Sequence, residues 1–177
     1  APAYGTGAGG ARMSLAPSTL SFGEVNAGTQ TATQNFRLQN EGSIAFGLQS
    51  VRFDNTQSGT WLLTSSDCPQ TISPGTQCNI GVAMKPNALD ASSATLIVQD
   101  NLFDPPVSAT VTGRGVMPKP TVSNASLDFG NQRVGRSPQT SLQSTITNVS
   151  SVPLAMQSMQ VFGDASAFSV WTSCPIG

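Results

Sequence analysis

Residues 20–28 read Leu-Ser-Phe-Gly-Glu-Val-Asn-Ala-Gly, and residues 127–135 repeat the pattern as Leu-Asp-Phe-Gly-Asn-Gln-Arg-Val-Gly. The similarity continues beyond these stretches at a spacing of 106 to 108 residues. The further matched pairs are Leu38 and Ile146, Asn40 and Asn148, Trp61 and Phe168, and Cys68 and Cys174. One shared tetrapeptide could be coincidence, but several segments that keep nearly the same spacing indicate an internal repeat.

The repeat predicts how the chain is divided. Residues 1–7 match residues 109–115 and share their Gly-x-Gly ending, so we expect them to be the last strand of a preceding repeat. Residues 8–116 form a complete unit, and residues 117–177 are the first, truncated part of a further unit. The joint between these units holds two prolines, which favour an extended and semi-rigid connection. Its residues are Val116, Met117, Pro118, Lys119 and Pro120.

The composition favours strands over helices. The chain has 12 Pro and 17 Gly but only two Lys and two Glu, so it is poor in helix formers and rich in turn residues. Apolar side chains alternate at Cys78, Ile80 and Val82, as in a half-buried strand. We therefore predict an all-β protein of tandem immunoglobulin-like β-sandwich repeats, each with about seven strands in two antiparallel sheets. The expected core residues are Phe22, Phe36, Leu38, Trp61, Ile80, Val82, Leu96, Val98, Val111 and Phe129.

The charge and the missing histidine restrict the function. With 8 basic and 9 acidic residues, the chain lacks the basic surface that binds nucleic acid. No apolar run is long enough for membrane insertion. Without histidine, neither a Ser-His-Asp triad nor a His-containing zinc site can be built from this chain. We therefore predict a protein that is not an enzyme, with no catalytic residues, no metal and no cofactor.

The three cysteines are best explained as one pair and one half of a second pair. Cys68 and Cys78 enclose a Pro-Gly turn without further metal ligands, so a disulfide is preferred to a zinc site. Closing a loop of this size stabilises the fold by about 2.5 to 3 kcal/mol. Such a bond persists in an oxidising compartment, which predicts an extracellular, cell-surface or periplasmic protein. Cys174 would be unpaired by truncation; a free thiol or an intermolecular bridge is the alternative.

Two weaker patterns remain. Asp100, Asn101 and Asp104 could offer oxygens to calcium, although their spacing is not that of an EF-hand loop. Asn124-Ala125-Ser126 and Asn148-Val149-Ser150 are glycosylation sequons, whose number is near chance in so Ser-rich a chain.

The complete unit resembles a family of immunoglobulin-like domains. The resemblance is carried by Leu20-x-Phe22-Gly23-x-Val25-x-x-Gly28, Leu38-x-Asn40-x-Gly42, Ile72-Ser73-Pro74-Gly75-x-x-Cys78-x-Ile80-x-Val82 and Val111-Thr112-Gly113-x-Gly115. It is similar to the choice-of-anchor D and ASH (ASPM, SPD-2, hydin) group, which is akin to the major sperm protein fold. One departure is Met84, which stands where the family usually has Phe. The resemblance implies an array module, and the cysteine pair favours the bacterial extracellular branch.

These observations lead to one functional hypothesis and several alternatives. We expect a structural or adhesive segment of a bacterial extracellular protein, with stacked repeats acting as a stalk or as a filament unit that donates strands between chains. Its partners would be neighbouring repeats or copies of the same chain. The alternatives are a module that binds carbohydrate or a surface protein, a virion or tail decoration domain, and an accessory domain of an enzyme in the same polypeptide.

Overall fold

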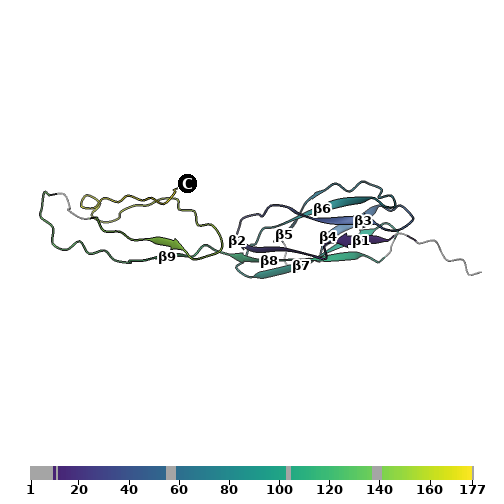
Figure 1. Ribbon diagram of the computed structural model, residues 1–177, viewed down its shortest axis with the longest axis horizontal. Coiled ribbons are helices and arrows are strands. Elements are labelled where there is room, and N and C mark those ends of the chain that lie inside the picture. Colours follow the sequence, from purple (N-terminus) through teal and green to yellow (C-terminus); the bar gives the residue numbers. More distant parts are fainter. Residues whose placement is uncertain (1–9, 11, 55–58, 103–104, 137–140, 177) are drawn as a thin grey trace, which may run out of the picture. The chain divides into compact units, whose positions relative to one another are not determined.

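The secondary structure of the described residues is entirely β. The computed structural model describes residues 10, 12–54, 59–102, 105–136 and 141–176 (Figure 1). This part of the chain holds no helix that could cross a membrane. The chain divides into two compact units, 1–116 and 117–177, and each is described by itself. The strand predicted for residues 1–7 lies outside the described residues.

Unit 1 contains two four-stranded sheets. The first sheet has the order β1–β3–β6–β5, with β1 at Met13–Ala16, β3 at Gln34–Asn40, β6 at Gln77–Met84 and β5 at Trp61–Ser66. The second has the order β2–β8–β7–β4, with β2 at Thr19–Asn26, β8 at Val107–Val116, β7 at Ala91–Asp100 and β4 at Leu48–Phe53. Apolar side chains from both sheets form a single buried cluster, so unit 1 is a two-layered β-sandwich.

Most of the residues expected in the core are buried. Those with little or no exposure are Phe36, Leu38, Trp61, Ile80, Val82, Leu96, Val98 and Val111. Phe22 is instead half-buried and packs against the edge of the cluster, because it lies on edge strand β2. Phe129 is half-buried in unit 2, where fewer strands surround it. Met84 is fully buried and belongs to the core cluster.

The strand count and the pairing differ from the prediction. The described part of unit 1 has eight strands rather than about seven, because the first strand is interrupted at Pro17. Proline has no N–H to continue a ladder, and the chain changes sheets there: β1 pairs with β3, whereas β2 pairs with β8. The β2–β8 pair is parallel, so the expectation of two wholly antiparallel sheets was wrong.

Two glycines at the end of β8 are needed because there is no space for a side chain. A Cβ at Gly113 would meet the sulfur of Met84, and a Cβ at Gly115 would meet the backbone oxygen of Ala88. The Gly-x-Gly ending of the repeat therefore marks where β8 passes close to neighbouring chain segments.

Unit 2 repeats the first strand pairing of unit 1. Its strands β9 (Pro120–Val122) and β10 (Ile146–Asn148) are antiparallel, and Pro120 lies opposite Asn148. In unit 1, Met13 lies opposite Asn40 in the same arrangement. The partners are displaced by 107 and 108 residues, which is the spacing of the sequence repeat.

Three local features of the two units also agree. Asn40 donates its side-chain amide to the Ile44 carbonyl at 2.9 Å, and Asn148 donates its own to the Val152 carbonyl at 2.7 Å. The corresponding glycine pairs have positive φ: 64° and 59° at Gly23 and Gly130, and 82° and 73° at Gly28 and Gly135. The rings of Phe22 and Trp61 lie 5.6 Å apart, and those of Phe129 and Phe168 lie 5.8 Å apart.

Candidate functional site around the Cys68–Cys78 disulfide

Cys68 and Cys78 form the disulfide that their spacing predicts. Their sulfurs are 2.05 Å apart and their Cα atoms 4.8 Å apart. Cys78 is on central strand β6 and is 3% exposed, whereas Cys68 follows the end of β5 and is half-buried. The bond therefore ties the end of an edge strand to the centre of the first sheet, and Cys68 is the more exposed of its two residues.

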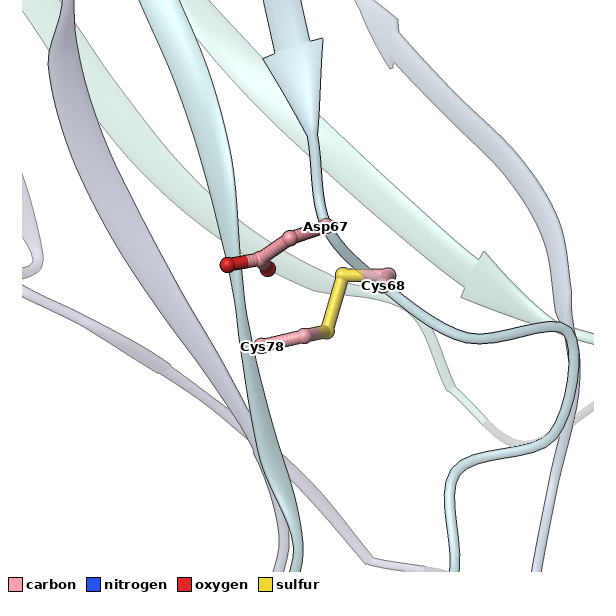
Figure 2. Close-up of side chains that lie close together, drawn as sticks. All are labelled: Asp67, Cys68 and Cys78. Carbon is pink, nitrogen blue, oxygen red and sulfur yellow. A yellow bond between two sulfur atoms is a disulfide. The ribbon is translucent and has the colours of Figure 1, made fainter.

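Asp67 lies directly beside this disulfide (Figure 2). One of its carboxylate oxygens and the two sulfurs all lie within 4.8 Å of one another. The carboxylate accepts hydrogen bonds from the backbone N–H of Asn79 and from its Nδ2, the latter at 2.9 Å. These hydrogen bonds, the backbone one first, lower the pKa of Asp67. Sequence analysis did not single out Asp67, since its partner is twelve residues away.

The loop enclosed by the disulfide is also held by the backbone. The Gly75 N–H donates to the Asn40 carbonyl at 2.9 Å, and the Asn40 N–H donates to the Thr76 carbonyl at 3.0 Å. Ile72 is bridged to Phe46 by two backbone hydrogen bonds of 2.7 and 3.2 Å. The loop therefore has several attachments to the sandwich besides its covalent one.

Asn40 is a structural residue that sequence analysis did not single out by itself. Its side chain is fully buried and its Nδ2 donates to the carbonyls of Ile44 and Ile72, each at 2.9 Å. Its Oδ1 accepts from the Gly42 N–H at 2.9 Å. The Asn-x-Gly pattern and the matching asparagine of the repeat, Asn148, were the available signals, but they do not reveal the contact with Ile72.

Two of the oxygens considered for calcium accept hydrogen bonds from the chain itself. Asp100 is fully buried, and its Oδ1 accepts from the Leu102 N–H at 3.1 Å. Asn101 Oδ1 accepts from the Gly47 N–H at 2.9 Å. Asp104 lies outside the described residues. Asp67, Cys68 and Cys78 form a cluster of metal-ligand type, but sulfurs joined in a disulfide are not thiolate ligands.

The remaining candidate residues lie in or beside unit 2. Cys174 is a free, half-buried cysteine. Of the joint residues, Val116 ends β8 and its carbonyl accepts from Ala27, while Pro120 begins β9. The Lys119 carbonyl accepts from the Val149 N–H at 3.0 Å. The expectation that the joint is semi-rigid stays a prediction.

No protein-family model and no curated protein matches this sequence. Solved structures that match part of this chain include the VesB protease of Vibrio cholerae, at 16% identity and a TM-score of 0.46, over 58% of this chain and 31% of VesB. The secreted serine protease VesC of the same organism matches at 15% identity and a TM-score of 0.44, over 60% of this chain and 23% of VesC. The ASH/PapD-like domain 7 of human CEP192 matches at 8% identity and a TM-score of 0.43, over 60% of this chain and 87% of that domain.

These neighbours contradict the prediction that the chain is not an enzyme. Two are proteases, and a family 123 glycoside hydrolase from Clostridium perfringens also matches, at 9% identity and a TM-score of 0.41, over 56% of this chain and 23% of that enzyme. The prediction rested on the missing histidine, which excludes a histidine-based site only when all its residues come from these 177. This chain spans less than a third of either protease.

Proposed function

We propose that this chain is a segment of a bacterial extracellular protein in which immunoglobulin-like units follow one another and act as a stalk or filament unit. The observation that carries the proposal is the agreement between the two units. The β9–β10 pair repeats the register of β1–β3, at the spacing of the sequence repeat. The disulfide supports an oxidising, extracellular location, and the sequence resemblance to choice-of-anchor D domains supports an array module.

The packing of the residues that carry the repeat supports the proposed role of a stalk. Leu38 and Trp61 pack inside unit 1, and Asn40 closes a turn. The repeated positions thus support packing and turn geometry, which is what a spacer needs. A stalk of this kind can carry a catalytic domain as well as an adhesive one.

A chimera tests whether unit 2 is the beginning of the same sandwich. Residues 69–116 would be joined directly after Cys174, because Cys174 occupies the position of Cys68 in the repeat. We expect this chimera to unfold cooperatively and to contain a disulfide between Cys174 and Cys78. Two free thiols and a non-cooperative transition would refute the equivalence of the units. Residues 117–177 alone are the control.

A domain exchange tests the role itself. In the full-length protein, residues 13–116 would be replaced by an unrelated immunoglobulin-like domain of the same length. A spacer role predicts that surface attachment is retained, and with it the activity of the domain that the stalk carries (the distal domain). Loss of attachment with the distal domain intact, together with a hit for residues 13–116 on a glycan array, would favour the carbohydrate-binding alternative instead.

A further inference from the structure

Asp67 places a fixed negative charge beside a disulfide. The oxygen that lies within 4.8 Å of the sulfurs belongs to a carboxylate anchored by two hydrogen bonds from Asn79 (Figure 2). Within the described part of the chain, no salt bridge involves Asp67, so an ion pair does not neutralise its charge. The lowered pKa keeps this carboxyl ionised at neutral pH.

The charge matters for the reaction that opens a disulfide. An external thiolate attacks one sulfur, forms a new S–S bond with it, and displaces the other sulfur as a thiolate. Cys68 is half-buried and Cys78 is 3% exposed, so we expect the attack at the more exposed residue, on Cys68 Sγ. The electron pair of the broken bond then goes to Cys78 Sγ, which takes a proton from solvent. A second external thiol releases Cys68 as a thiol and leaves as the reagent's own disulfide.

During this exchange, negative charge is present on the sulfur of the attacking thiolate and on the departing Cys78 Sγ. A carboxylate within 4.8 Å of the disulfide raises the energy of the incoming thiolate and of the departing Cys78 thiolate. We propose that Asp67 is an electrostatic guard that makes the Cys68–Cys78 disulfide resist anionic thiols and exchange preferentially with neutral or cationic ones. This inference concerns the chemistry of unit 1 and does not depend on the stalk proposal.

Unit 2 provides an internal comparison. The Cys68 N–H donates to Ser66 Oγ at 3.2 Å, and the Cys174 N–H donates to Thr172 Oγ1 at 2.9 Å, so the two cysteines lie in similar turns. The residue before Cys174 is Ser173, where unit 1 has Asp67. The turn therefore forms without a carboxylate, and turn geometry alone does not account for Asp67.

The test compares three thiols that differ in charge. As thiolates, glutathione is doubly negative, mercaptoethanol is singly negative and cysteamine has no net charge. The rate constants for opening the disulfide would be measured for the Asp67→Asn variant and its parent, both carrying Cys174→Ser so that no third thiol takes part. Asparagine keeps an acceptor for the Asn79 N–H and removes the charge. Trapping with an alkylating reagent followed by mass spectrometry gives the rates.

At low ionic strength we expect Asp67→Asn to increase the rate of disulfide opening by glutathione roughly three- to tenfold and by mercaptoethanol roughly twofold. The increase for cysteamine should be the smallest, because only the repulsion of the departing Cys78 thiolate, which is common to all three reactions, is then removed. At about 1 M salt, where the screening length is about 3 Å, the differences should disappear. The control is Asp54→Asn, whose carboxylate accepts from the Thr95 N–H elsewhere in unit 1; it should leave all three rates unchanged.

Equal acceleration of all three thiols would mean that the substitution merely loosens the loop, and it would overturn the proposal. Unchanged rates would overturn it as well. The parent protein gives a second test that needs no folded variant: its ratio of the glutathione rate to the cysteamine rate should rise with salt by more than the same ratio for a short peptide disulfide without acidic residues. An equal rise would refute the proposed electrostatic role of Asp67.

Discussion

Asn40→Ala should be among the most destabilising single substitutions in unit 1. The wild-type side chain is fully buried and takes part in three hydrogen bonds, two donated by Nδ2 to Ile44 and Ile72 and one accepted by Oδ1 from Gly42. Alanine removes all three. The Ile72 carbonyl keeps its bond from the Phe46 N–H, so one of the three former partners remains satisfied.

The magnitude follows from these partners. Each lost hydrogen bond costs about 1 kcal/mol, and a buried group left without a partner costs more, so we expect a loss of about 2 to 4 kcal/mol. For a domain of this size, that lowers the midpoint of thermal unfolding by about 10 to 25 °C. The loss should appear in the free energy of unfolding with little change in its dependence on urea, because the fold stays the same.

Urea unfolding followed by the fluorescence of Trp61 measures this loss. Trp171 in unit 2 is the second tryptophan and is exposed, so the measurement is made in a Trp171→Phe background. Asn35→Ala is the matched control, because Asn35 is on the same strand with an exposed side chain. If the two variants lose the same free energy, the buried amide of Asn40 does not stabilise the turn as we infer.

Three further outcomes are expected. Gly115→Ala should destabilise unit 1 by more than about 2 kcal/mol in thermal unfolding, since its Cβ would meet the backbone oxygen of Ala88; a neutral effect would contradict the close approach. Replacing Cys68 and Cys78 together by serine should lower the free energy of unfolding, measured in urea, by about 2.5 to 3 kcal/mol. An unchanged free energy would show that the backbone hydrogen bonds of the loop hold it without the disulfide. Because the pKa of Asp67 is lowered in the folded state, its contribution is complete above the unfolded pKa and is lost as pH falls through the folded one. Asp67→Asn should therefore lose less stability than wild type on acidification below about pH 4, and identical pH profiles would refute this.

The sequence predicts the features that repeat or alternate. Alternation at Cys78, Ile80 and Val82 gives the buried face of β6, and the two cysteines around a Pro-Gly turn give the disulfide. Such local patterns predict the structure correctly because each of them depends on only a few neighbouring residues.

Features that depend on residues far apart in the chain were missed. The change of sheets at Pro17 places β2 beside β8, which lies about ninety residues later in the chain. The alternation of apolar residues along β2 does not indicate which strand it pairs with. Asp67 was not singled out, because its hydrogen bonds to Asn79 span a loop. In both cases the sequence contains the residue, but its role is set by which distant strand the fold brings next to it.

Asn148 shows how a structural role can produce a sequence motif of another kind. Its Nδ2 donates to the Val152 carbonyl at 2.7 Å, and its Oδ1 accepts from the Ser150 N–H at 3.1 Å. The Ser150 hydroxyl lies 2.6 Å from the same Oδ1. Both the asparagine and the serine of the sequon are thus explained by the turn after β10, and the amide nitrogen that glycosylation would modify is already donated within it. In unit 1, Gly42 takes the position of Ser150 and the same turn forms without a sequon.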